Sequence, residues 1–574
     1  MKKNSSYRNP MSLASLVPMA MLATTLLVPL GAVAWAIEPL RVQHQWELDP
    51  KLDSKWALEN FPAIQAVKIE LLDSTFDLDR LKAAQWAGYA ARNKLAVEPG
   101  SFERLLKAIQ SADINPQLRQ ACISSAADIA GQENVAELWK AISSDSRNAH
   151  LGERALVRLR HPAARDIWRQ RLNDEIVSRN WLLACEGLAA TGDESDAALL
   201  VKQVRRDKLP VAYRIAAAKA LGTVAKLGQH PFATQILGSN LEHRHLIAAH
   251  ILRSHSGDVA SPILQRIIAE GPTTAQGVAY AALCKSAPNE ARKLAPQMVS
   301  HAENTIRQST LDLLQTFSDM ESLDLQSNRL ADTHSALRNL ARNQLLAKYT
   351  ADEKLRPKLL AYIDREMASN DWHGIEQAIL LAAEISDHAR CEKLIELLEH
   401  PVVDVNVTAA WSLRILANSP EIYGQMLEHA VKWTDRLSRL DPATHDDFHR
   451  LAHLLEALGD RHYEPVEPIL QKYVPKGDFR MGYVSRMSGI WALGKYWKDG
   501  DNYPLAQKLA ERAADKLSAN PEMDGIRYAA TIAIGFIADE RSREELIANA
   551  EPLPNPCGYA TQWALERLDK KKKP

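Results

Sequence analysis

A ten-residue phrase that occurs twice is the feature that most constrains the fold of this chain. The sequence reads YRIAAAKALG at 213–222 and IRYAATIAIG at 526–535. In both copies an arginine is followed seven residues later by an apolar residue, and seven residues are two helical turns, so the two positions share one face of a helix. The alanines between them allow a neighbouring helix to approach closely. The phrase therefore predicts a helix that packs tightly against similar helices.

The same pattern recurs along the chain when the arginine is used as a marker. The intervals between copies are mostly about thirty to forty residues, which is the range of helical repeats. The marker positions are Arg119, Trp181, Arg214, His245, Gly277, Arg307, Arg338, Glu376, Asn406, Arg450, Arg486 and Arg527. We expect each of them to lie on an inner helix of a stack.

A second, amphipathic segment follows each inner segment after a short loop of Gly, Asp, Asn or Pro. Examples are VAELWKAI (135–142), FATQIL (232–237) and CEKLIELL (391–398). The repeating unit is thus a helix, a turn and a helix. Alternation of β-branched and polar residues between hairpin turns is nearly absent, so the chain is predicted to be all-α.

Several inner segments resemble the second helix of HEAT repeats, which often reads Asp, two residues, Arg, then alanines and leucines. These segments are DGIRYAATIAIG, PVAYRIAAAKALG, ENTIRQSTLDLL and PVVDVNVTAAWSL. Asp524 and Arg527 match the Asp and Arg of the family pattern, whereas Asn406 and Trp181 stand where the Arg is expected. The resemblance covers about residues 79 to 550. Tetratricopeptide and armadillo arrays share the helix-pair logic, but the spacings here vary and no W-x₂-L-G-x₂-Y run recurs.

The resemblance implies an all-α, HEAT-like α-solenoid of stacked antiparallel helix pairs. A single pair cannot bury its apolar faces alone, so each repeat is stabilised by its neighbours. The inner helices of such a stack line an extended concave surface that suits another protein.

The first 36 residues have the pattern of a secretory signal peptide. Lys2, Lys3 and Arg8 precede an uncharged run over 11–36, which ends in Ala34-Trp35-Ala36, the small-x-small pattern of a signal peptidase site. Cleavage there would start the mature chain at Ile37 and leave no membrane span. The alternative is an uncleaved N-terminal anchor, since the run is long enough to cross a bilayer. We interpret the chain as an exported protein of bacterial type, periplasmic or extracellular.

The rest of the chain divides by composition and spacing. Residues 37–78 lack the repeat phrase and are predicted to be an N-terminal linker or cap. HEAT-like repeats are expected over 79–417 and again, with a C-terminal cap, over 481–569. Between them, 418–480 is predicted to be an irregular repeat or bend, because the spacing widens and Pro442, Pro465, Pro468 and Pro475 gather there. Residues 570–574 form a lysine-rich tail, which we expect to be solvated.

Charge and cysteine content narrow the function classes. Seventy Lys and Arg stand against seventy-one Asp and Glu, a net charge of -1, so no overall field favours nucleic acid or an anionic membrane. The five cysteines form no CxxC pair or haem-attachment site. Cys122 and Cys185 lie among alanines, and we interpret the cysteines as small core residues.

A search for chemistry gives one weak metal candidate. His445, His449 and His453 stand four apart on a predicted helix, and three imidazoles on one face are able to hold a transition metal, with Asp446 or Asp447 as a further ligand. A second group, at His243, His245, His250 and His255, is scattered around its helix and is expected to be core or surface histidine. The sequence has no phosphate-binding loop, GxSxG turn or HExxH helix, so no catalytic residue and no cofactor are predicted.

These observations favour a non-catalytic interaction scaffold or adaptor that binds a protein partner on the concave face of a solenoid. Thirteen tryptophans in an exported all-α chain leave one alternative, a helical toroid enzyme that acts on carbohydrate with stacking tryptophans and paired carboxylates such as Asp446 and Asp447. Trp411 and Trp491, however, fall at core spacing and suit repeat interfaces. The HEAT-like lyases that attach bilins share only the repeat type.

Overall fold

The computed structural model describes residues 67–571 apart from 176, 178–179, 207, 256–258, 439–444, 477–480, 518 and 553–554. The predicted signal peptide (1–36) and most of the predicted linker or cap (37–78) lie outside these residues. Every regular element in the described part is an α-helix or a short 3₁₀ helix, which confirms the all-α prediction. No helix among the described residues is both long enough and apolar enough to span a membrane.

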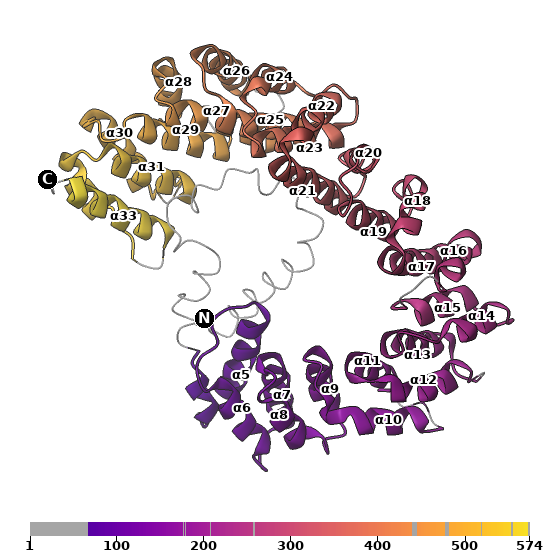
Figure 1. Cartoon of the computed structure of the whole chain (residues 1–574). Helices are drawn as coiled ribbons and strands as arrows, with labels where there is room; N and C mark the ends of the chain where they lie inside the picture. Colours follow the sequence, from indigo (N-terminus) through magenta and orange to yellow (C-terminus); the bar gives the residue numbers. More distant parts are fainter. Residues whose placement is uncertain are drawn as a thin grey trace, which may run out of the picture. The chain divides into compact units, whose positions relative to one another are not determined.

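The chain forms two compact units that part between Ser322 and Leu323, within the helix α20 (Met320–Ser327). We call them the N-terminal unit and the C-terminal unit, and each is built in the same way. In both units the helices form two rows (Figure 1). Odd-numbered helices pack on one another and make an inner layer. The even-numbered helices other than α20 form an outer layer, in which each packs against the odd-numbered helix that follows it.

The first described element of the N-terminal unit is the 3₁₀ helix η4 (Ile69–Asp73), which packs on α5 and α6. Its inner layer consists of α5 (Asp77–Arg92), α7 (Pro116–Ile129), α9 (Ala149–Arg158), α11 (Trp181–Thr191), α13 (Val211–Val224), α15 (Arg244–Leu252), α17 (Thr273–Ser286) and α19 (Asn304–Leu314). Its outer layer consists of α6 (Ser101–Gln110), α8 (Val135–Ile142), α10 (Arg165–Asn173), α12 (Ala197–Val204), α14 (His230–Leu237), α16 (Ser261–Glu270) and α18 (Pro288–Met298).

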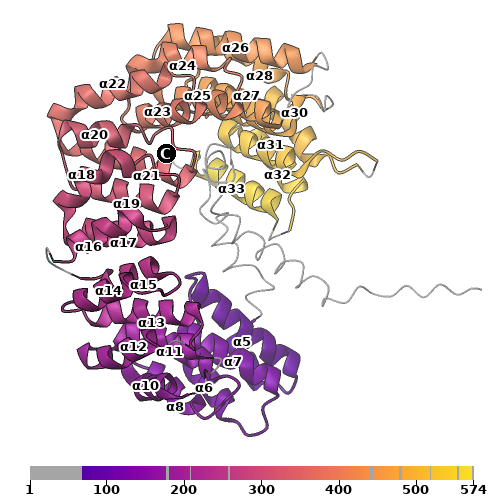
Figure 2. The ribbon, with the colours of Figure 1, turned by 90° about the vertical axis from the view of Figure 1, so that its right-hand side faces the viewer.

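The C-terminal unit repeats the arrangement (Figure 2). Its inner layer consists of α21 (Ser335–Ala351), α23 (Trp372–Glu384), α25 (Val403–Leu416), α27 (His445–Asp460), α29 (Tyr483–Tyr496), α31 (Asp524–Ile537) and α33 (Pro556–Lys571). Its outer layer consists of α22 (Arg356–Met367), α24 (Cys391–Leu397), α26 (Pro420–Ser438), α28 (Glu467–Gln471), α30 (Tyr503–Ala514) and α32 (Arg543–Ala548). The segment 418–480 holds α26, the longest described helix at 19 residues, and α28, among the shortest at 5 residues.

All twelve marker positions lie on inner-layer helices, as expected from the repeated phrase. The companion segments at 135, 232 and 391 begin or lie within the outer helices α8, α14 and α24. Helix α9 falls in the wide interval between Arg119 and Trp181 and carries no marker. It has only two alanines among its ten residues, so the phrase is absent although the helix takes its place in the stack.

Five of the marker side chains donate hydrogen bonds to carbonyl groups in the last turn of the preceding even-numbered helix or in the loop that follows it. The last carbonyls of a helix have no partner within it, so a donor from another element stabilises them. The donors include Arg307 to His301 and Ala302 O (both 2.9 Å), Arg338 to Asp332 O (3.0 Å), Arg527 to Ala513 O (3.1 Å) and Arg119 to Ile109 O. Asn406, which replaces the arginine, donates to His400 O at 3.0 Å. This contact gives a structural reason for the arginine at these four positions, and Arg527 also pairs with Asp524 at 3.0 Å.

Glycine at the end of the phrase sets the distance between inner helices. A Cβ built at Gly222 would lie 2.0 Å from the carbonyl oxygen of His250 in the next inner helix. At Gly494 the corresponding Cβ would lie 2.5 Å from Cα of Ala533 in α31. In both places a backbone occupies the space of a side chain, so the two helices touch directly. The prediction that small residues form the contact between repeats is confirmed at these two places.

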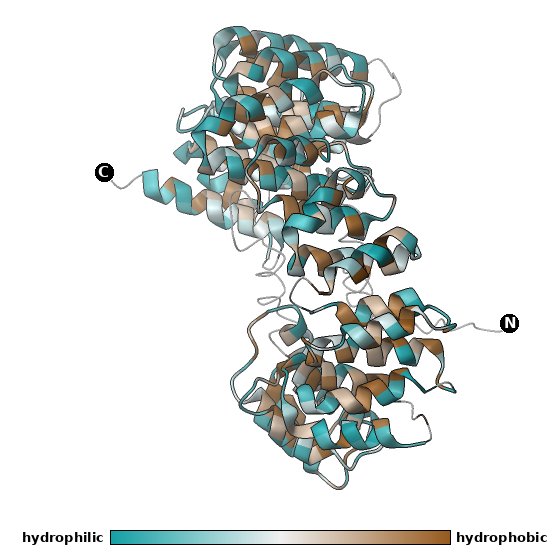
Figure 3. Cartoon of the chain, turned by 45° about the vertical axis from the view of Figure 1, so that its right-hand side comes forward, coloured by the Kyte–Doolittle hydropathy of each residue, from teal (hydrophilic) through white to brown (hydrophobic). Residues whose placement is uncertain are grey.

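Large apolar side chains fill the space between the layers. Trp168, Trp181 and Trp491 are fully buried, in line with the expectation for Trp491, whereas Trp411 is half-buried. All five cysteines are free thiols, and four of them are buried, which agrees with their interpretation as core residues. Figure 3 shows hydrophobic and hydrophilic residues alternating along individual helices, as expected for helices with one packed side.

At the C-terminal end, the first two lysines of the predicted tail belong to α33. The helix runs to Lys571, whose Nζ lies 2.7 Å from Asp501. Nearby, Arg567 makes two 3.0 Å contacts with Asp499. The last helix is thus held to the loop before α30 by ion pairs.

Candidate functional site

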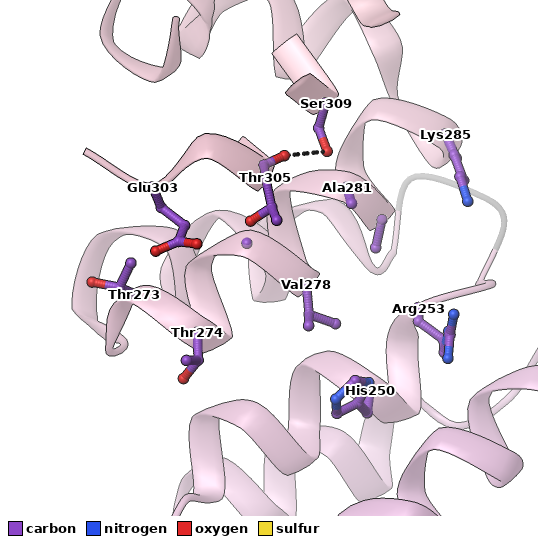
Figure 4. A pocket seen from close by; sticks show the side chains of 12 residues that line it. His250, Arg253, Thr273, Thr274, Val278, Ala281, Lys285, Glu303, Thr305 and Ser309 are labelled. Carbon is purple, nitrogen blue, oxygen red and sulfur yellow. Dashed lines mark hydrogen bonds between the residues drawn. The ribbon is translucent and has the colours of Figure 1, made fainter. Parts of the chain in front are cut away.

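A hollow of about 430 Å³ lies on the inner layer of the N-terminal unit, over α15, α17 and α19 (Figure 4). Its volume is within the range of pockets that hold small molecules or short peptide segments. The lining residues are His250, Arg253, Thr273, Thr274, Gly277, Val278, Ala281, Ala282, Lys285, Glu303, Thr305 and Ser309. The sequence did not predict this site.

Helix α17 forms the floor of the hollow. Thr274, Val278, Ala281 and Lys285 follow one another at steps of three or four residues, which places them on one face of the helix. Their exposure ranges from half-buried to exposed, whereas Ala275, Ala279 and Leu283 on the other side are buried. The hollow therefore opens on the side of α17 that faces away from the outer layer.

One end of the hollow is basic. Arg253 caps the C-terminus of α15, and Lys285 lies in the last turn of α17, where a positive charge interacts favourably with the helix dipole. Lys219 of α13 also acts on this region, because its charge lowers the pKa of His250. Among the described residues none of these three cations forms an ion pair with an acidic side chain. This end is thus a positively charged surface whose charge is not neutralised within the described chain.

His250 lies beside this basic end (Figure 4). Burial, followed by the charges of Arg253 and Lys219, lowers the pKa of its imidazole from 6.5 to about 4. The ring is therefore neutral at pH 7. Its Nδ1 is buried and has no hydrogen-bond partner within the part of the chain that the structure describes.

The opposite end of the hollow is acidic and rich in hydroxyl groups. Figure 4 shows Glu303, Thr273 and Thr274 on the side away from Arg253 and Lys285. Glu303 is the N-cap residue of α19 and is exposed. Ser309 donates its hydroxyl hydrogen to the carbonyl of Thr305 at 3.0 Å, the ordinary bond of a helical serine. The site thus presents opposite charges at its two ends.

The predicted metal candidates fall on the inner helix α27. His449 and His453 lie one turn apart and are 3% and 2% exposed, whereas the side chain of His445 is outside the described residues. No group of three or more His, Cys, Asp and Glu side chains in the described part of the chain is placed to hold a metal ion. A metal bound by His445, His449 and His453 together stays a prediction.

The second histidine group does not gather, as expected. His243 is exposed at the N-cap of α15, and His255 is buried and accepts a hydrogen bond from the Gln229 amide at 3.1 Å. His250 is the member with a place in the hollow. This place was not predictable from the sequence, because the other walls of the hollow come from α17 and α19.

Comparisons with known proteins give distant likenesses among solved structures. No protein-family model matches the chain, and no curated protein matches it. Importin beta crystallised in ammonium sulfate is 11% identical over 88% of this chain and 72% of its own, with a TM-score of 0.44. Kap95 in its complex with Nup1 is 11% identical over 87% and 72%, with a TM-score of 0.47. The karyopherin Kap121p bound to the SUMO protease Ulp1p is 11% identical over 91% and 68%, with a TM-score of 0.41.

Proposed function

We propose that the protein is a non-catalytic scaffold or adaptor that holds a protein partner on the open face of its inner helix layer. The observation that carries this proposal is the hollow over α15, α17 and α19, with its unpaired cations at one end and Glu303 at the other. Exposed groups of both signs next to an apolar floor provide specific contacts for a polypeptide. Nothing in these groups favours nucleic acid, since the whole chain has a net charge of -1.

The polar groups of the hollow support binding rather than turnover. Ser309 is hydrogen-bonded to its own helix and not to a base, so it lacks the activation that a nucleophilic serine needs. Arg307, Arg338 and Arg527 have a structural role, because they donate hydrogen bonds to carbonyls at or just beyond the end of the preceding even-numbered helix. We further propose that the chain acts outside the cytoplasm, which the apolar run over 11–36 supports.

Capture of the partner from the native cell envelope tests this function. The mature protein is crosslinked in place, and its adducts are identified by mass spectrometry. A matched pair of variants gives the site: Val278→Glu adds a charge in the hollow, whereas Lys202→Glu changes an exposed residue of the outer helix α12. We expect the partner to be lost with Val278→Glu and kept with Lys202→Glu. Recovery of the protein alone, together with breakdown of added polysaccharide, would overturn the proposal in favour of an enzyme.

A further inference from the structure

We propose that the hollow over α15, α17 and α19 binds a short extended peptide of the partner, with an acidic side chain at the Arg253–Lys285 end and a cationic group at the Glu303 end. This inference rests on the proposed function and names the kind of segment that the inner layer would hold.

The length of the ligand follows from the helix that forms the floor. Thr274 and Lys285 mark the two ends of the exposed stripe on α17 and are eleven residues apart. At about 1.5 Å per residue the stripe is roughly 16 Å long. An extended chain advances about 3.3 Å per residue, so about five residues span the distance between the two ends.

The basic end suits a carboxylate. The guanidinium group of Arg253 offers parallel N–H donors that match the two oxygens of a carboxylate, and Lys285 adds a point charge. Both lack an acidic partner among the described residues.

The other end suits a cation and the peptide backbone. Glu303 is exposed and forms no ion pair with a described side chain, so a lysine, an arginine or an amino terminus would pair with it. The hydroxyl groups of Thr273, Thr274 and Thr305 lie between the ends or beside Glu303 (Figure 4) and provide donors and acceptors for peptide groups. Gly277, Val278 and Ala281 give a small apolar floor that lets the peptide backbone approach.

A direct test uses fluorescein-labelled five-residue peptides and the mature full chain. One peptide carries Glu at one end and Lys at the other, a second has the reverse order, and in two controls Gln replaces the Glu or the Lys. We expect one of the two charged orders to bind at least tenfold tighter than either control, as measured by fluorescence anisotropy. Loss of a hydrogen bond to a charged group has an effect of this size.

Variants of the protein assign the binding to the hollow. Arg253→Ala and Lys285→Ala are each expected to weaken the charged peptide about tenfold, and Glu303→Gln to weaken it several-fold. Lys202→Ala on the outer helix α12 is the control and should leave the affinity unchanged. The most specific test reverses the charge on both molecules. The Lys285→Glu variant should bind a peptide in which Lys replaces the Glu more tightly than it binds the original peptide.

Several results would overturn the inference. These are the absence of charge-dependent peptide binding up to about 1 mM, equal weakening by Lys202→Ala, displacement of the peptide by an equal concentration of inorganic phosphate, or tighter binding of a DNA duplex through the same cations. If partner capture is still lost with Val278→Glu while the peptides show no charge dependence, the inference fails and the scaffold function stands. If capture does not depend on Val278, the scaffold function fails at this face.

Discussion

Replacing Gly222 by alanine tests the contact between two inner helices. The added Cβ would lie 2.0 Å from the carbonyl oxygen of His250 and 2.8 Å from that of Ile251. Both oxygens belong to the backbone of α15 and have no rotamer that avoids the clash, so α13 and α15 must separate. Overpacking of this kind costs about 1–3 kcal/mol, while alanine regains about 1 kcal/mol of helix propensity. Because the clash is severe, we expect Gly222→Ala to lower the local free energy of unfolding by about 2 kcal/mol.

Hydrogen exchange measured by mass spectrometry detects this loss of stability in the individual helices in which it occurs. A long repeat array does not unfold as one cooperative unit, so a single melting curve is a poor measure. A loss of about 2 kcal/mol accelerates the exchange of peptides from α13 and α15 about thirtyfold, whereas peptides from α31 should be unaffected, since repeats contact only their neighbours.

A second glycine provides the control for this prediction. A Cβ at Gly277 in α17 would lie 3.6 Å from Ile306 Cγ1, an ordinary contact, so Gly277→Ala should slow exchange or leave it unchanged. Unchanged exchange of α13 and α15 in Gly222→Ala, or equal acceleration in both variants, would show that the backbone contact at Gly222 does not limit the approach of the two helices.

Four further predictions follow from buried groups and from the N-terminus. Burial raises the pKa of Glu376, so this residue stabilises the fold below the ordinary carboxyl pKa, and that contribution is lost as the pH rises through the raised value. At pH 7.5 the hydrogen exchange of α23, corrected for the intrinsic rate, should be as slow in Glu376→Gln as in the wild type or slower, and this advantage should disappear at pH 4.5. Faster exchange of α23 in the variant at pH 7.5 contradicts this. Arg486 pairs with Glu522 at 3.0 and 2.9 Å, with both side chains nearly fully buried, and Arg486→Ala should cost about 3–5 kcal/mol by leaving a buried carboxylate unpaired, seen as faster exchange in α29. Burial raises the pKa of the Cys122 thiol to about 12, so iodoacetamide should label it at pH 8 only after denaturation. Mass measurement of the exported protein should show cleavage after Ala36, and an intact N-terminus would favour the anchor.

The positions and the order of the helices could be predicted from the sequence because the contacts between inner helices require particular residue types. Arginine at several marker positions donates to carbonyls at or just beyond the end of the preceding outer helix, and glycine at the end of the phrase allows backbone contact. Both requirements place arginine and glycine at fixed positions of the repeated phrase, where they can be recognised in the sequence. Helix α9 was missed because its contacts are made without the phrase: Gly152 packs against Ile142 and Glu153 binds Trp168 and Arg171.

The hollow was not predictable because it combines side chains from three consecutive repeats. Arg253 and Lys285 each come eight residues after a marker position, where Gly222 stands in the copy before. The sequence therefore contains a signal, because two adjacent copies of the phrase carry a long basic side chain at this position. This signal could not be interpreted as a binding site without the spacing of α15, α17 and α19. The neutral state of His250 likewise depends on burial and on Lys219 from a separate helix.

Site-specific photocrosslinking tests most directly whether the inner layer is the binding surface. A photoreactive amino acid is placed at Val278 on the floor of the hollow or at Lys202 on the outer helix α12, and each protein is irradiated in its native envelope. The scaffold account predicts an adduct with one partner from position 278 and none from position 202. Adducts from position 202 alone, or equal adducts from both, would contradict it.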